Sequence, residues 1–116
     1  MEVREADRGR LKSDKGEAVA AVWEMVSILE AERRNPDAWE RTCLMRALSD
    51  LFSGRYGLAL CEARLARTPA KQRSPTAALS TDPVTARLDV ALIRKVMTHV
   101  DAEPLRYPHF GPVVLT

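Results

Sequence analysis

The sequence predicts an all-α fold, a small bundle of about four helices with a central tight helical hairpin and an extended proline-rich C-terminal tail. Most apolar residues are Ala, Leu and Val, and aromatic residues make up only 5% of the chain. Alanine and leucine are strong helix formers. No stretch alternates apolar and polar residues between turn signals, as a half-buried strand does. With 116 residues, the chain has the length of one domain with a modest core, and residues 16–103 are expected to form it.

The N-terminal part of the chain divides into a charged segment and a helix. Residues 1–15 carry charges of both signs and almost no large apolar side chains, so we expect a mobile segment or a frayed helix end. A helix is predicted over residues 15–34, with Ser13 or Asp14 as its cap. Its inner face is predicted from apolar residues three or four positions apart, namely Val19, Val22, Val26 and Leu29, with Trp23 beside them.

A second helix is predicted over residues 36–53. Asn35 is expected to cap it, and Pro36 fits its first turn because an N–H there needs no helical partner. Asp37 suits the positive end of the helix dipole, and Gly54 is expected to end the helix in a left-handed conformation. The predicted inner face consists of Trp39, Cys43, Leu44, Ala47, Leu48, Leu51 and Phe52. The predicted polar face consists of Glu40, Arg46, Ser49, Asp50 and Ser53.

The third helix, predicted over residues 55–67, is apolar on two sides. A helix with two apolar sides is expected to have neighbours on both, and its alanines allow one neighbour to come close. The first stripe consists of Tyr56, Ala59, Leu60, Ala63 and Ala66. The second stripe consists of Leu58, Cys61 and Leu65.

The C-terminal third is predicted to contain a long loop, one helix and a tail. Residues 68–81 carry two prolines and several small polar residues, which is typical of a linker or long loop. A helix is predicted over residues 82–100, capped by Thr81 or Asp82. Its apolar face is predicted from Leu88, Ala91, Leu92, Ile93, Val96, Met97 and Val100. Residues 104–116 contain three prolines and many apolar side chains, so we expect an extended segment that docks on this domain or on a partner.

The central hairpin resembles a single degenerate tetratricopeptide repeat over residues 36–69. The residues that carry the resemblance are Ala47, Gly54, Tyr56, Ala59 and Ala66, while Trp39 lies one helical turn too early for the family's register. The alternative interpretation is a generic helical hairpin of a small bundle. The resemblance implies a module that binds peptides or proteins and has no catalytic activity of its own.

The sequence contains no recognisable catalytic motif, so we expect no enzymatic activity, no cofactor and no metal site. The closest approach to a ligand set is His99, Asp101, Glu103 and His109, but their spacing matches no known site and two prolines interrupt it. We therefore expect solvated polar groups at the end of the last helix.

The overall composition favours a cytoplasmic protein with no membrane association. A net charge of +2 is too small to indicate nucleic acid or acidic membranes by itself. No apolar run approaches the length of a membrane span, and the N-terminus does not have the pattern of a secretory signal. Cys43 and Cys61 do not form a disulfide framework and are expected to be reduced core thiols.

The predicted function is protein–protein interaction, with another protein or a second copy of the chain as partner. The residues expected to contact a partner lie on faces that the core does not need, namely Trp23, Leu58, Leu65, Tyr107 and Phe110. The alternative hypothesis is nucleic-acid binding through the basic stretch of residues 55–73. The basic side chains of that stretch are Arg55, Arg64, Arg67, Lys71 and Arg73.

Overall fold

The computed structural model describes the backbone of residues 5–102 and the side chains of residues 14–100. Within this part the chain forms α-helices and no strand, which confirms the predicted all-α class. The predicted C-terminal tail, residues 104–116, lies outside the described residues. The helices are α1 (Glu5–Ala31), α2 (Ala38–Phe52), α3 (Tyr56–Ala66), α4 (Pro83–Ala86) and α5 (Val90–Ala102), with a 3₁₀ turn at Ala70–Gln72.

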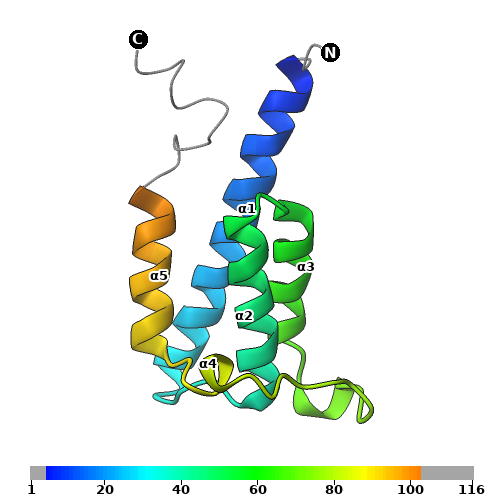
Figure 1. The fold of residues 1–116 in the computed structure, drawn as a ribbon, viewed down its shortest axis with the longest axis vertical. Helices are drawn as coiled ribbons and strands as arrows, with labels where there is room; N and C mark the ends of the chain where they lie inside the picture. Colours follow the sequence, from blue (N-terminus) through cyan, green and yellow to red (C-terminus); the bar gives the residue numbers. More distant parts are fainter. Residues whose placement is uncertain (1–4, 103–116) are drawn as a thin grey trace.

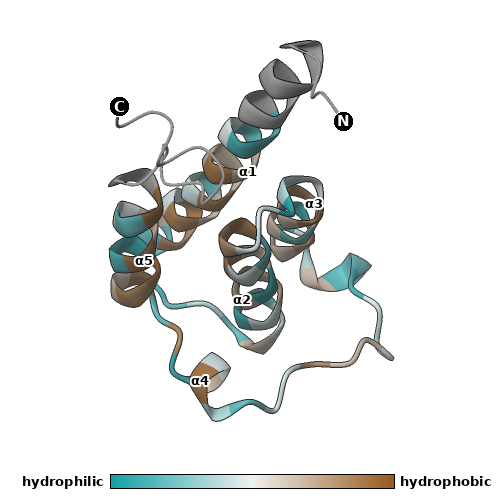
Figure 2. Cartoon of the chain, turned by 45° about the horizontal axis from the view of Figure 1, so that its top comes forward, coloured by the Kyte–Doolittle hydropathy of each residue, from teal (hydrophilic) through white to brown (hydrophobic). Residues whose placement is uncertain are grey.

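Helices α1, α2 and α3 form the centre of the fold. α2 runs antiparallel to the other two and packs against α3 in a tight hairpin, while α3 also packs along α1 (Figure 1). α5 packs against α1, and α4 contacts α2. Apolar residues gather where α1, α2 and α3 meet (Figure 2). α5 contributes to the same core, and the largest fully buried side chains of the described residues are Met25, Leu29, Leu44, Ile93, Met97, Val22 and Val26.

Helix α1 is longer at its N-terminal end than predicted. It begins at Glu5, within the segment expected to be mobile or a frayed helix end, so neither Ser13 nor Asp14 is its cap. It ends at Ala31 rather than at residue 34. The chain leaves the helix through Arg33, whose φ of 54° is left-handed, and this conformation lets the Arg34 N–H bond to the carbonyl of Leu29 at 3.1 Å.

Helix α2 is capped by Asp37 instead of the predicted Asn35. The Asp37 carboxylate accepts a hydrogen bond from the Glu40 N–H at 2.9 Å, and the Glu40 carboxylate accepts one from the Asp37 N–H at 2.9 Å. This reciprocal pair is a capping box, which satisfies two donors at the helix start. Two predicted orientations are wrong: Glu40 is buried instead of facing solvent, and Phe52 is 61% exposed instead of facing inward.

The alanine-lined side of α3 explains how the hairpin packs. Ala59, Ala63 and Ala66 are fully buried, so α3 comes close to its neighbours, while Gly54 closes the turn from α2 with a φ of 75°. A left-handed residue without a side chain avoids a steric clash at this turn. The first predicted stripe of α3 is therefore its inner face, since Tyr56 is buried as well and Leu60 packs against the core.

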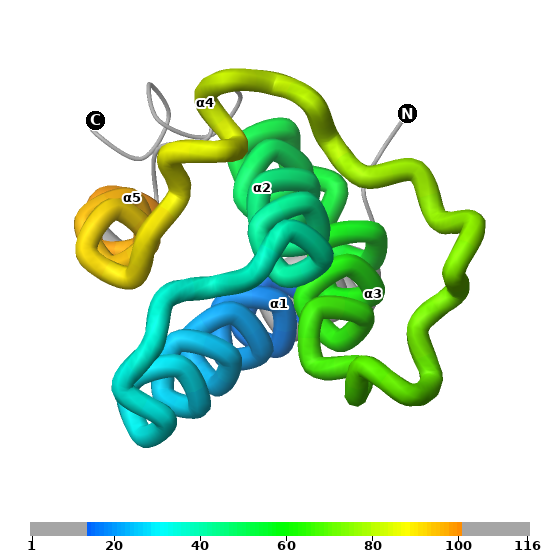
Figure 3. The backbone as a smooth tube through the Cα atoms, turned by 90° about the horizontal axis from the view of Figure 1, so that it is seen from below, coloured from blue at the N-terminus to red at the C-terminus, as the bar shows by residue number. Residues whose placement is uncertain are grey.

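The segment between α3 and α5 differs most from prediction. Residues 68–81 pass α2 on the way to α4 (Figure 3), and the Ser80 N–H donates to the Thr42 hydroxyl at 3.1 Å. The predicted helix of residues 82–100 is two helices, α4 and α5. Asp82 caps the first, as expected.

Two side chains that cap the start of α5 explain why the predicted helix is interrupted there. The Asn35 side-chain oxygen accepts a hydrogen bond from the Val90 N–H at 3.0 Å, and the Asp89 carboxylate accepts one from the Leu92 N–H at 2.8 Å. Both bonds satisfy donors that a continuous helix would use internally. Of the predicted apolar face, Ile93 and Met97 are buried in the core, whereas Ala91 and Leu92 are exposed.

Candidate functional site

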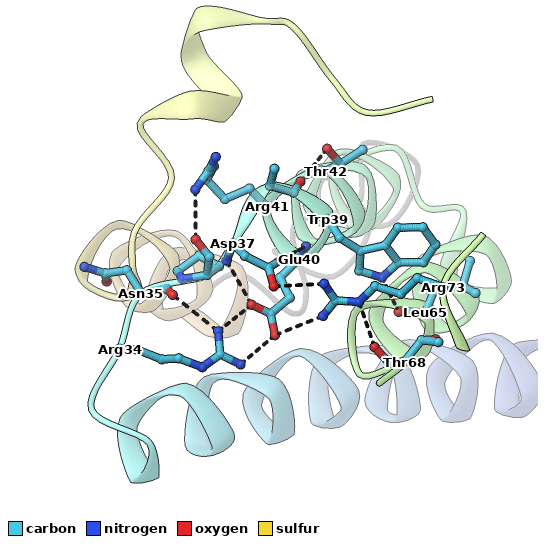
Figure 4. Close-up of polar contacts among 12 residues, drawn as sticks. Arg34, Asn35, Asp37, Trp39, Glu40, Arg41, Thr42, Leu65, Thr68 and Arg73 are labelled. Carbon is cyan, nitrogen blue, oxygen red and sulfur yellow. Dashed lines mark hydrogen bonds and ion pairs between the residues drawn. The ribbon is translucent and has the colours of Figure 1, made fainter. Parts of the chain in front are cut away.

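A cluster of ion pairs joins the ends of three helices, and its centre is Glu40 (Figure 4). The Glu40 side chain is almost completely buried at the start of α2. The Arg34 guanidinium donates to both of its oxygens, at 2.6 and 2.8 Å. A two-pronged pair of this kind is strong and directional. Glu40 therefore fixes the connection between α1 and α2 rather than belonging to a solvated face.

Arg73 ties the loop after α3 to the same cluster. It donates to the Asp37 carboxylate at 2.9 Å and to the carbonyl of Thr68 at 2.9 Å (Figure 4). Its guanidinium also lies over the Trp39 ring, 5.6 Å from the ring centre. The Trp39 N–H in turn donates to the carbonyl of Leu65 at 2.8 Å. The role of Arg73 in the structure is thus to hold the loop against α2.

The same cluster makes stability depend on pH. Burial opposes ionisation of Asp37, but the hydrogen bonds from the Glu40 N–H and Arg73 outweigh it and lower the pKa of Asp37 below its ordinary 3.8. A carboxyl group with a lowered folded-state pKa stabilises the fold above the unfolded pKa and loses this contribution as the pH falls through the folded value.

Asp37→Asn is therefore expected to lower the free energy of unfolding at pH 7. Asn still caps the helix but lacks the charge that binds Arg73. The difference from the wild type should shrink as the pH falls below about 4. Urea unfolding followed by circular dichroism between pH 7 and pH 2 measures the free energy of unfolding of both proteins. If the difference between them were the same at every pH in this range, the lowered pKa of Asp37 would be contradicted.

The second predicted stripe of α3 faces away from the core. Leu58 is 55% exposed and Leu65 is 45% exposed, and Cys61 between them is exposed too. Leu79, from the loop that passes α2, is exposed beside Leu65. We refer to Leu58, Cys61 and Leu65 as the outer face of α3.

A small pocket opens next to this outer face. Its volume is about 230 Å³, and it lies between α2, α3 and residues 77–79 of the loop. Trp39, Cys43, Leu65 and Leu79 are among its lining residues. Glu62 lines it as well, and the Oε2 atom of Glu62 is buried without a hydrogen-bond partner in the described part of the chain. A buried carboxylate oxygen without a donor is costly, so this atom marks a place where a donor from outside can bind.

The two cysteines differ in environment, whereas both were expected in the core. Cys43 is buried, but Cys61 is exposed on the outer face of α3. Burial, followed by the nearby charge of Glu62, raises the pKa of the Cys43 thiol to about 11. A thiol reacts as its thiolate, so a raised pKa and burial both protect it.

We expect iodoacetamide at pH 8 to modify Cys61 in the folded protein and to leave Cys43 intact. Mass spectrometry of the intact chain should show one added group under native conditions and two in urea. The variant Cys61→Ser serves as the control, because it should add no group until it unfolds. Equal rates of labelling at both positions would contradict the described burial of Cys43.

The other residues predicted to bind a partner have different surroundings. Trp23, on α1, is half-buried, and the guanidinium of Arg94 on α5 lies 5.7 Å from its ring centre. Trp23 therefore belongs to the packing of α5. Tyr107 and Phe110 lie outside the described residues.

The basic residues of the alternative hypothesis are largely paired with acids. Arg55 binds Asp50 at 2.9 Å, Arg67 binds Glu24 at 3.0 Å, and Arg73 belongs to the Glu40 cluster. Arg64 and Lys71 are exposed and form no ion pair with a described residue. The pairing leaves two of the five basic side chains for phosphate groups.

Among the residues with described side chains, no group of His, Cys, Asp and Glu is arranged to hold a metal ion. His99 is exposed near the end of α5, while Asp101, Glu103 and His109 lie outside that part. Within the described residues, no helix is long and apolar enough to cross a membrane.

Three features of the site were not predicted from the sequence: the burial of Glu40, the position of Leu79 and the unpartnered oxygen of Glu62. A sequence signal exists for the first feature, because the Asp-x-x-Glu spacing of Asp37 and Glu40 is the sequence pattern of a capping box. The other two depend on where the loop returns to α2 and α3, which no local pattern indicates.

Comparison with known proteins provides no relative of this chain, since no known family, curated protein or solved structure matches it.

Proposed function

We propose that this chain is a non-catalytic protein–protein interaction module that binds its partner through the outer face of α3. The observation that carries the proposal is the exposure of Leu58, Cys61 and Leu65 along a helix whose opposite side is fully buried. Leu79 and the pocket extend this apolar surface toward α2. Neighbouring exposed apolar side chains on a small domain typically mark a site of protein association.

Two further considerations favour a protein as the partner. Aliphatic side chains on a helix are suited to packing against another helix, and they supply no chemistry for catalysis. The likeness of residues 36–69 to a tetratricopeptide hairpin points to the same function, because that family binds proteins and peptides. The nucleic-acid alternative gains less support, since acids pair with Arg55, Arg67 and Arg73.

We also propose that the protein works in a reducing compartment, the cytoplasm. Both cysteines are free thiols, and Cys61 is exposed to solvent. An exposed thiol of this kind persists where glutathione and thioredoxin keep it reduced.

Two measurements on the full chain test the proposed function. Sedimentation equilibrium reports self-association, and panning of a displayed random-peptide library against sparsely immobilised protein reports binding to other chains. Each is repeated with the double variant Leu58→Ser/Leu65→Ser and with Val84→Ser. Val84 is an equally exposed apolar residue on α4 and serves as the matched control.

We expect association or peptide binding that weakens by about tenfold or more in the double variant and stays unchanged in Val84→Ser. Circular dichroism should show that both variants remain folded, since all three positions are exposed. A chain that stays monomeric and selects no peptide sensitive to the double variant would overturn the proposal.

A further inference from the structure

The Glu62 carboxylate lines the pocket beside the outer face of α3 and lacks a partner among the described residues. Its Oε2 atom is buried without a hydrogen-bond donor. Glu62 also forms no ion pair with a described residue. Removing a carboxylate oxygen from water without supplying a donor is costly. The pocket therefore has an acceptor that a donor from another molecule would satisfy.

The nitrogen and oxygen donors among the side chains that line the pocket are directed elsewhere. The Trp39 N–H donates to a backbone carbonyl of α3 at 2.8 Å, and the Thr42 hydroxyl donates to one of α2 at 2.8 Å. The Arg46 guanidinium is directed to the carbonyl of Ala78, at 3.5 Å. None of these side chains supplies the donor that Glu62 lacks.

The size and lining of the pocket favour a single basic side chain as its occupant. Its volume of about 230 Å³ is below the roughly 300 Å³ at which small-molecule sites begin, and one carboxylate is too few ligands for a metal ion. Leu65 and Leu79 line the pocket and are each 45% exposed, so it opens onto the outer face of α3. A lysine or arginine has an apolar stem that packs along such leucines and a charged head that binds a carboxylate strongly.

We infer that the partner of the outer face of α3 is a protein segment with one basic side chain among apolar ones, and that its lysine or arginine enters the pocket and binds the Glu62 carboxylate. The inference rests on the proposed function and specifies its partner. The apolar neighbours of the basic residue pack on Leu58 and Leu65. Arg46 lines the pocket and Arg64 is exposed on α3, so a segment with many positive charges is disfavoured.

Peptide binding to the full chain tests this pairing. A displayed random-peptide library is panned on the wild type, and the selected peptides that Leu58→Ser/Leu65→Ser no longer binds are synthesised. Fluorescence anisotropy gives their dissociation constants for the wild type, Glu62→Gln and Glu30→Gln. Glu30 is the matched control, because it is an exposed glutamate that binds Arg94 of α5, away from α3. Each peptide is also made with acetyl-lysine for lysine or citrulline for arginine, which removes the charge and keeps the stem.

We expect the selected peptides to share a lysine or arginine next to apolar residues, and Glu62→Gln to weaken their binding by about tenfold or more. Glu30→Gln should bind them like the wild type. Removing the charge from the peptide should weaken binding to the wild type by a similar factor. The same change should weaken binding to Glu62→Gln little further, because the two charged groups act on each other.

Unfolding of the free protein shows whether Arg46 already occupies the carboxylate. Circular dichroism in urea compares the wild type with Arg46→Gln, Glu62→Gln and the double variant. Since Glu62 has no partner in the structure, Glu62→Gln should fold and be at least as stable as the wild type, and the two changes should add. A favourable coupling between Arg46 and Glu62 would mean that the free pocket is closed by its own ion pair, and would overturn the inference.

The binding results separate failure of the inference from failure of the proposed function. Selected peptides without a basic residue, or binding that Glu62→Gln leaves unchanged, would overturn the inference alone. A homodimer sensitive to Leu58→Ser/Leu65→Ser that forms equally well in Glu62→Gln would have the same meaning. A chain that stays monomeric and selects no peptide sensitive to Leu58→Ser/Leu65→Ser would overturn both.

Discussion

Replacing Glu40 by alanine is expected to lower the free energy of unfolding by about 3 kcal/mol, because it removes one partner of a buried ion pair. The Arg34 guanidinium loses both of its bonds to Glu40, and the N–H of Asp37 loses its acceptor. The effect should lie at the lower end of the range for buried pairs, because Arg34 is partly exposed and regains water.

Urea unfolding followed by circular dichroism measures this loss. Glu40→Gln should fall between the wild type and Glu40→Ala, since the amide oxygen still accepts from Asp37 but carries no charge. Glu24→Ala removes an exposed ion pair with Arg67 and should cost no more than about 1 kcal/mol. If Glu40→Ala were as stable as Glu24→Ala, the cluster would not hold the helix ends together.

The second large effect is expected for Ala63→Leu on the inner face of α3. Ala63 is fully buried, and α3 packs against both α1 and α2. A leucine adds volume to a filled core, which costs about 1–3 kcal/mol and forces the helices apart. We expect a value of about 3 kcal/mol, because the neighbouring Ala59 and Ala66 leave no space either.

The adjacent position offers a matched control for this prediction. Arg64→Leu introduces the same side chain on the exposed side of the same helix, and it should change stability by less than about 0.5 kcal/mol at low protein concentration. Thermal unfolding of both variants compares them directly. Similar melting temperatures for Ala63→Leu and the wild type would mean that α3 is not closely packed.

The helical elements were largely predictable, because each depends on neighbours in sequence. Apolar periodicity placed α2 and α3 within two residues of their observed ends, and Gly54 marked the turn between them. The two stripes of α3 were also recognised. Leu58 and Leu65 of the second stripe were expected on a face that the core does not need, and both are exposed. Cys61 belongs to the same stripe but was expected in the core, and it is exposed as well.

What was not predictable depends on contacts between distant segments. Asn35 has the sequence context of a cap for α2, yet it bonds to the N–H of Val90, far along the chain, and so helps to begin α5. Glu40 has the sequence context of a solvated residue of α2 until Arg34 and Arg73 approach it from the two sides. Long-range partners of this kind override local preference, and periodicity contains no information about them.

The one-sided packing of α5 determines how the fold opens under native conditions. α5 lies mainly against α1, whereas α1, α2 and α3 each contact the other two. Elements with few neighbours detach in local openings of low free energy, while a mutually packed unit opens only as a whole. Amide protons of α5 should therefore exchange with deuterium well before those of α2 and α3, which makes the three-helix centre the last part of the chain to unfold.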